Sequence, residues 1–345
     1  MINVSNYGVK GFYTFKGNIN KDFRPCATSI NRDEAYFRAC NEANEVMGIE
    51  NTIFPEILNI GKDTTNYILP IHLHPFLWNE RLKRDVDWYN KTRVPYIKFL
   101  NYKNEKVTYI PRDLSVYNNR DDKIGLSWLQ YEGYAYDEKL EDAKIKSIME
   151  LIEKDVITLW WHRETKSVNI VIDKNRELRD IEVNLKEQGI SMKSMELVND
   201  MGVYVVVTIL QQKNDYPKVC YGSAAHFNID EAIKRSIYEA ISVIAGERYQ
   251  FINNKEISEE QRIPEFLENN IEKKLSQYKE IKSLELALNK YNFYYTYSSY
   301  GKGYLVKSYC YEMQPVLYKT SVHLTKRFIL ASDTQVEIKD DFPFI

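Results

Sequence analysis

The chain lacks several features that would assign it at once to a common class. Its four cysteines are scattered and form no C-x-x-C pair, so neither a zinc site nor a disulfide framework is expected. No apolar run of about 18 residues occurs, which argues against a membrane-spanning helix. The first residues, MINVSNYGVKGFYTF, hold no basic segment followed by an apolar core, so we expect no signal peptide. A cytoplasmic protein is the simplest interpretation.

Charge of one sign is also lacking. The 47 basic and 49 acidic residues leave a formal net charge of −2, so neither nucleic acid nor a membrane surface is expected as a partner. The 345 residues allow one large domain or two ordinary ones. No Gly/Ser linker or low-complexity block divides the chain, and we therefore expect a single domain over residues 1–345.

Hydrophobic periodicity predicts a mixture of helices and strands. Helical spacing or composition predicts helices at 33–47, 138–162, 176–188, 230–246 and within 258–289. Strand-like runs occupy 96–100, 107–110, 168–172 and 202–210, and the tyrosine-rich tail 290–345 also resembles strands. The fold class predicted from this order is α+β.

Three of the expected helices share a pattern of acids. Residues 33–45 read DEAYFRACNEANE, residues 141–153 read EDAKIKSIMELIE, and residues 230–242 read DEAIKRSIYEAIS. Each begins with two acids and an alanine: Ala35, Ala143 and Ala232. A base follows three residues later, as Arg38, Lys146 and Arg235, and a glutamate seven after the alanine, as Glu42, Glu150 and Glu239. A second glutamate follows in the first two copies, as Glu45 and Glu153, where the third copy has Ser242.

The spacing of the pattern places side chains on one side of each helix, because positions seven apart lie two turns on and positions three apart are neighbours. For a single helix, solvated glutamates on a wet face are the simpler interpretation. Three copies in register weaken that interpretation. Converging carboxylates would repel one another unless cations were bound, and oxygen ligands suit Mg²⁺ shared with substrate phosphates. The sequence therefore predicts a metal–nucleotide site without a P-loop.

These segments, in their order along the chain, resemble the YcaO family of ATP-dependent enzymes that modify peptide backbone amides. The similar segments are DWYNKTRVPYIKFLNYKNEKVTYIPRDLSVY (87–117), YEGYAYDEKLEDAKIKSIMELIEKD (131–155) and VCYGSAAHFNIDEAIKRSIYEAISVIAGER (219–248). The resemblance implies a YcaO-like α+β fold of mixed sheets packed with helices, with ATP and Mg²⁺ as cofactors. It also implies a precursor peptide as substrate, a separate leader-peptide-recognition protein as partner, and a homodimer.

Matching position by position assigns the site residues that the resemblance implies. The metal ligands, direct or indirect, are Glu42, Glu45, Glu150, Glu153 and Glu239, and the same residues bind the nucleotide. Further nucleotide-binding positions are Asp142, Lys146, Lys154 and Ser242.

The chain departs from the family pattern at several of the positions that face phosphate. Val46 and Ile244 stand where arginine is expected, and Ala27-Thr28-Ser29 stands for a Gly-Lys-Gly turn. Lys154 replaces an arginine, which keeps the charge but loses the bidentate fork, and Ser242 replaces a glutamine. These departures leave open a catalytically weak member that acts as a scaffold subunit.

The chemistry implied by the resemblance is the removal of a backbone amide oxygen with ATP. A nucleophile adds to the amide carbon, the resulting oxyanion takes the γ-phosphoryl group, and phosphate leaves. A Cys, Ser or Thr side chain of the peptide as nucleophile gives an azoline, whereas external sulfide gives a thioamide. In ring-forming members the C-terminus reaches the active site, so the Ile345 carboxylate is a candidate catalytic base.

Overall fold

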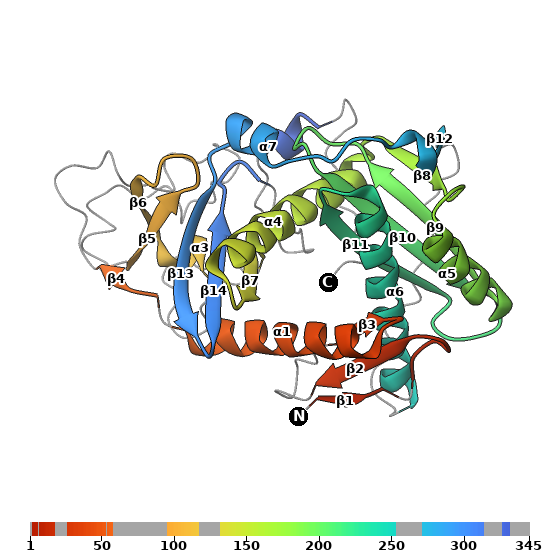
Figure 1. Cartoon of the computed structure of the whole chain (residues 1–345). Coiled ribbons are helices and arrows are strands. Elements are labelled where there is room, and N and C mark those ends of the chain that lie inside the picture. The colour runs from red at the N-terminus through yellow and green to blue at the C-terminus, as the bar shows by residue number, and fades with distance from the viewer. Residues whose placement is uncertain are drawn as a thin grey trace. The chain divides into compact units, whose positions relative to one another are not determined.

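The computed structural model of the protein describes residues 2–5, 7–17, 26–52, 54–57, 95–116, 132–252, 271–313 and 326–331 (Figure 1). Contacts within the chain define two compact units. Unit 1 comprises Met1–Val46, Glu164–Leu284 and Asp341–Ile345, and unit 2 comprises Met47–Arg163 and Glu285–Asp340. Whether the chain acts as the single domain expected from the sequence stays a prediction.

Unit 1 contains two sheets. The smaller is antiparallel in the order β1 (Ile2–Val4), β2 (Tyr13–Gly17), β3 (Cys26–Ser29). The larger has the order β11 (Val219–His226), β10 (Tyr204–Gln212), β9 (Ile190–Leu197), β8 (Ser167–Val171), β12 (Ile271–Lys274). Its pairs are antiparallel except β12 with β8, which is parallel.

The helices of unit 1 are α1 (Arg32–Asn51), which belongs to this unit up to Val46, α5 (Arg176–Glu187) and α6 (Ile229–Ile252). A short 3₁₀ turn, η5 (Leu275–Gln277), follows β12. The apolar stripe of α5, which consists of Leu178, Ile181 and Leu185, joins the buried face of α6 in one hydrophobic cluster with β10. The sequence of β10, YVVVTILQQ, is buried at almost every position, as expected for an interior strand rich in β-branched residues.

Within unit 1, β11 and α6 lie very close together at Gly222. A Cβ atom on this glycine would lie 2.2 Å from the Ser236 carbonyl oxygen and 2.3 Å from the Ala240 nitrogen. Because both neighbours are backbone atoms of the helix, only glycine allows α6 to lie this close to the strand. The contact fixes how near the Ser236–Ala240 part of α6 lies to β11.

Unit 2 is built on one sheet with the order β4 (Glu56–Ile57), β5 (Tyr96–Asn101), β13 (Tyr294–Tyr300), β14 (Gly303–Tyr309), β7 (Tyr134–Asp137), and β6 (Val107–Pro111) pairs with β5. Its long helix, α4 (Leu140–Arg163), packs against β14 and β7. Shorter helices are α3 (Arg112–Ser115), α7 (Glu285–Lys290) and α8 (Lys326–Ile329).

Polar groups fasten α4 inside unit 2 at both ends. Near its start, the Ser147 hydroxyl lies 2.6 Å from the Gly133 carbonyl oxygen and 2.7 Å from the Ser308 hydroxyl. Towards its end, the fully buried Asp155 carboxylate accepts a hydrogen bond of 2.8 Å from Arg327 of α8. Arg327 is partly exposed, but its loss would leave the buried Asp155 carboxylate without this partner, which costs stability. Arg327 of α8 therefore helps hold the end of α4 in place.

The long helices and most predicted strands agree with the structure, but the tail predicted as strands contains α8 (Lys326–Ile329), and β9 (Ile190–Leu197) was not predicted. The helix expected within 258–289 is wrong for Ile271–Lys274, which forms β12. The sequence IEKK is too polar to indicate a strand, and parallel pairing with β8 imposes the extended backbone. Among the described residues, no helix is long and apolar enough to cross a bilayer.

The packing at Gly222 leads to a stability prediction. We expect Gly222→Ala to lower the free energy of unfolding by about 1–3 kcal/mol, because the added methyl group overlaps the backbone of α6. Gly246→Ala, later on the same helix, is the matched control, since a Cβ atom there meets nothing within 4 Å. That change should stabilise the protein by about 0.5–1 kcal/mol. Urea unfolding measures both, and equal effects of the two substitutions would contradict the close contact.

Candidate nucleotide and metal site

The three acid-bearing segments have the same local layout in the structure. Each consists of a strand, a two-residue turn and a long helix: β3 to α1, β7 to α4, and β11 to α6. From the last strand residue to the first glutamate the step is 13 residues in every copy, from Ser29 to Glu42, Asp137 to Glu150, and His226 to Glu239. The glutamates therefore occupy equivalent positions along their helices. That they share one role in binding a metal stays a prediction.

The acids and alanine that the three copies share at their start have a structural role at the beginning of each helix. Ala35, Ala143 and Ala232 are fully buried, and their N–H groups donate the first helical hydrogen bonds, to the carbonyls of residues 31, 139 and 228. In copies one and three an asparagine side chain caps the helix, with Asn31 accepting from Asp33 N–H at 2.9 Å and Asn228 from Asp230 N–H at 2.8 Å. Capping and packing explain the early acids and the alanine, but not the later glutamates.

Unit 1 places Glu42 in a half-buried position between α1 and β3. Burial raises the pKa of the Glu42 carboxyl to about 7, although a hydrogen bond from the Cys26 backbone and the charge of Arg38 act in the opposite direction. Burial, together with the Glu42 charge, also raises the pKa of the Cys26 thiol to about 12. This carboxylate therefore lacks the charge compensation that would keep it fully ionised at neutral pH. Glu45 lies one turn further along α1 and is half-buried as well.

The second acidic position of unit 1 is Glu239 on α6. The Ser223 N–H of β11 donates to Glu239 Oε2 at 3.2 Å, which fixes the carboxylate beside the middle of this strand. One turn on, the Ser242 hydroxyl donates to the Tyr238 carbonyl at 3.0 Å and meets the Thr28 hydroxyl at 2.8 Å. Ser242 thus joins α6 to β3, and both Ser242 contacts lie within unit 1.

Unit 2 holds the acids of α4. Glu150 and Glu153 are half-buried, and Lys154 Nζ lies 4.0 Å from Glu153 Oε1. Asp142 is exposed, and the exposed Lys146 binds the Asp137 carboxylate at the end of β7. Burial acts to raise the pKa of Asp137, but the hydrogen bond and charge of Lys146 outweigh it and hold that pKa below its usual value.

One charged residue beside these acids was not predicted from the sequence. Lys307 of β14 is 1% exposed, and its ammonium donates to the Glu132 carbonyl oxygen and lies 4.7 Å from the centroid of the Tyr134 ring. Burial lowers the pKa of Lys307 to about 8, against the opposing charges of Glu132 and Glu150. A lysine among strand tyrosines gives no sequence signal of this kind, because only the pairing of β14 with β7 reveals its neighbours.

Two positions at which the resemblance expects arginine are part of the hydrophobic core. Val46 is 3% exposed and Ile244 is fully buried. Both side chains pack into the core, so neither position presents a cation to a bound phosphate. The predicted catalytic base, the Ile345 carboxylate, lies outside the described residues.

The donor set fits Mg²⁺ by its chemistry, since all five candidate ligands are carboxylates. Within neither unit do the described residues gather three or more His, Cys, Asp or Glu side chains that could hold a metal ion. Glu42, Glu45 and Glu239 belong to unit 1, and Glu150 and Glu153 to unit 2.

Comparisons with known proteins agree with the resemblance. The family model described as YcaO cyclodehydratase, ATP- and Mg²⁺-binding, matches residues 26–298. The predicted cofactors, ATP and Mg²⁺, are the two that this description names. A search of curated proteins finds no match.

Solved structures share the fold at low sequence identity. A YcaO protein from Methanopyrus kandleri bound with AMPPCP and Mg²⁺ aligns with a TM-score of 0.68 and 14% identity, over 91% of this chain and 85% of its own. A chain of the E. coli microcin synthetase McbBCD complex aligns at 0.67 and 14%, over 95% and 94%. A heterocyclase in complex with substrate and cofactor aligns at 0.70 and 13% over 91% of this chain, which spans about half of the heterocyclase. The predicted α+β, YcaO-like fold is confirmed.

The raised pKa of Glu42 predicts a pH-dependent stability in metal-free buffer. Its folded value of about 7 lies above the unfolded value of about 4.3, so the folded state binds more protons between these limits and loses stability as the pH rises. Relative to wild type, Glu42→Gln should gain up to about 3 kcal/mol between pH 5 and pH 8. Urea unfolding in EDTA across this range measures the gain.

The control for this prediction is Glu182→Gln on α5, whose side chain is exposed. That variant should differ from wild type by the same small amount at every pH. A difference between wild type and Glu42→Gln that does not change with pH would show that Glu42 is ionised throughout.

Proposed function

Because the chain belongs to the YcaO family, we propose that it is an ATP- and Mg²⁺-dependent cyclodehydratase that forms azolines at Cys, Ser or Thr residues of a ribosomally made precursor peptide. The observation that carries this proposal is the common step of 13 residues from strand end to glutamate in three copies. Helix capping and core packing do not require a glutamate at that position, whereas a shared cation site does.

The proposed ligands of Mg²⁺ are Glu42, Glu45, Glu150, Glu153 and Glu239. Bound Mg²⁺ supplies positive charge that neutralises the polyphosphate of ATP during in-line transfer. Lys154 and Lys146 present ammonium groups on α4, one beside Glu153 and the other on Asp137, and we assign them and Asp142 to the nucleotide. Ser242 and the Ser223 N–H act by holding α6 and the Glu239 carboxylate in position.

The proposed reaction removes the amide oxygen of the substrate as phosphate. The peptide's thiol or hydroxyl loses its proton to water and adds to the preceding amide carbon, the former carbonyl oxygen bonds to the γ-phosphorus of ATP, and ADP leaves. Loss of phosphate from the carbon and of a proton from the amide nitrogen then forms the C=N bond of the ring. The Ile345 carboxylate is the proposed acceptor of that proton.

The proposed partners follow from the assemblies of the similar structures. One is a microcin synthetase complex with pro-MccB17 bound, and another is a heterocyclase about twice as long as this chain that holds substrate and cofactor. We therefore propose that this chain works with a separate leader-peptide-recognition protein. From the family resemblance alone, we also propose that it forms a homodimer.

Two alternative functions remain as proposals: formation of a thioamide, and a scaffold role with little or no catalysis. Thioamide formation would use the same acids with sulfide as nucleophile. A catalytically weak scaffold subunit is favoured by one observation, the inward packing of Val46 and Ile244 where cations are expected, since fewer cations then face the phosphates.

The metal assignment predicts the outcome of two substitutions. Glu150→Gln and Glu239→Gln should each lower Mg²⁺-dependent ATP turnover by at least about 100-fold, because a neutral amide binds Mg²⁺ far more weakly than a carboxylate. Both residues are half-buried on helix surfaces, so circular dichroism and thermal unfolding should remain close to wild type. Phosphate release with partner and peptide present measures turnover.

The matched control is Glu141→Gln on α4, whose carboxylate is exposed and pairs with Lys144. Its turnover should remain within about twofold of wild type, as for most exposed positions. Wild-type turnover in the Glu150 or Glu239 variants would refute the metal assignment. Absence of turnover in the wild-type complex would support the scaffold.

The chemistry predicts the mass of the product. A peptide treated with the complete complex should lose one water per modified residue, because ring formation expels the amide oxygen. Replacing oxygen by sulfur would instead indicate a thioamide. Intact-mass spectrometry with fragmentation, applied to candidate peptides with and without Cys, Ser and Thr, decides between the two products.

A further inference from the structure

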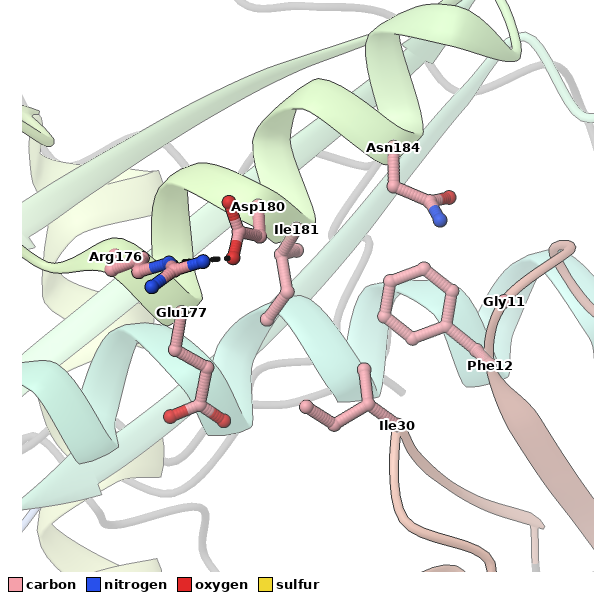
Figure 2. A pocket seen from close by; sticks show the side chains of 8 residues that line it. All are labelled: Gly11, Phe12, Ile30, Arg176, Glu177, Asp180, Ile181 and Asn184. Atoms are coloured by element: carbon pink, nitrogen blue, oxygen red, sulfur yellow. Dashed lines mark ion pairs between the residues drawn. The ribbon is translucent and has the colours of Figure 1, made fainter.

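Unit 1 contains a pocket of about 500 Å³ that shares no residue with the predicted nucleotide site. Figure 2 shows its lining, which comes from three segments far apart in the sequence. Gly11 and Phe12 precede β2, Ile30 follows β3, and Arg176, Glu177, Asp180, Ile181 and Asn184 lie on α5. Its volume is in the range of ligand pockets, roughly 300–1,000 Å³.

Hydrogen bonds hold the wall of this pocket in place. The Gln188 side chain accepts from the Lys10 N–H at 3.0 Å and donates to the Lys10 carbonyl at 2.9 Å, so it binds the loop before β2 as a strand would. Gln188 also donates to the Asn184 side chain. Gly11 has a φ of +87°, and a Cβ atom there would lie 2.6 Å from Asn184 Nδ2. The wall is thus formed before any ligand arrives.

The floor of the pocket is apolar and continues into the helix that carries Glu239. Phe12, Ile30 and Ile181 point towards one another from three directions (Figure 2), and Ile30 remains 39% exposed. The Phe12 ring meets the Tyr238 ring edge-on, with centroids 6.3 Å apart. Tyr238 immediately precedes Glu239 on α6. A group bound in the pocket would therefore contact Phe12, whose ring packs against Tyr238 of α6, the helix that carries Glu239.

The ionisable side chains that line the pocket are two acids and one base. Arg176 and Asp180 pair at 3.8 Å while both are largely exposed, which makes their interaction weak. Glu177 lies 3.9 Å from Lys234, which binds Glu231 more closely at 2.7 Å. The surplus of negative charge at the mouth suits a ligand with a positive charge beside an apolar group.

We propose that this pocket is a docking subsite for the precursor peptide, and that it receives a large apolar side chain next to a basic residue. The proposal rests on the proposed function for the identity of the peptide as substrate. The apolar floor, the negative mouth and the ring contact to α6 favour a peptide segment over an anionic metabolite. A segment bound here would be anchored while a neighbouring residue reacts.

Three short peptides test the subsite without ATP, Mg²⁺ or turnover. Acetyl-Gly-Lys-Phe-Lys-Gly-amide carries the apolar ring and positive charges, acetyl-Gly-Glu-Phe-Glu-Gly-amide reverses the charges, and acetyl-Gly-Lys-Ala-Lys-Gly-amide removes the ring. NMR titration of the full chain should give the first peptide a Kd at least roughly tenfold lower than either of the others. The double change Glu177→Gln with Asp180→Asn should remove most of the preference for positive charge.

The matched control is Glu187→Gln, an exposed acid at the end of α5 that does not line the pocket. It should leave all three affinities unchanged. Equal binding of the phenylalanine and alanine peptides, stronger binding of the acidic peptide, or an unchanged preference in the double variant would each overturn the proposal. A failure of the proposed function would appear instead in the Glu150 and Glu239 turnover assays, since neither residue lines the pocket.

Discussion

The contact between β11 and α6 at Gly222 is the constraint on which the candidate site in unit 1 depends. Because the helix backbone lies against the strand at this glycine, the next residue, Ser223, can direct its N–H to the Glu239 carboxylate. The same helix position brings Ser242 to Thr28 of β3. A larger residue at 222 would move α6 and separate all three groups together. Glu239 is therefore positioned first by the backbone packing of α6 and then by its own hydrogen bond to Ser223.

Negative charge is treated differently in the two units. In unit 1, burial raises the pKa of the Glu42 carboxyl to about 7. The positive charge of Arg38 lowers that pKa, but by less than burial raises it. Unit 2 places the cations Lys154 and Lys307 near Glu153 and Glu150. Carboxylates near a strand end without a full counter-charge reduce stability, and a folded protein retains such groups where binding a cation compensates. The two units thus surround their candidate ligands differently: Glu42 has Arg38 near it, and the α4 acids have Lys154 and Lys307.

Elements that depend on local interactions could be predicted from the sequence, whereas features that depend on tertiary contacts could not. The helices over α1, α4 and α6 could be predicted because early acids, a buried alanine and apolar spacing act within each segment. The common step of 13 residues from the strand end to the glutamate could not be predicted, because pairing with other strands decides where each strand ends. β12 was missed because its polar sequence becomes a strand only beside β8. Lys307 and the α5 pocket likewise arise from residues that only the fold brings together.

Two departures from the family pattern, Val46 and Ile244 in place of arginine, are residues of the core. Their packing limits which cations could hold the phosphates of a nucleotide. Val46 and Ile244 point into the core, where an arginine would bury its charge at a high energetic cost. Restoring those cations would require a change of the core as well as of the site. Of the candidate cations on α4, Lys154 lies beside an acid of the proposed metal site and Lys146 is held by Asp137. In the proposed enzyme, the charge of ATP would therefore be met mainly by carboxylate-bound Mg²⁺ and less by arginine forks. A steep dependence of nucleotide binding on Mg²⁺ is the physical consequence of that arrangement.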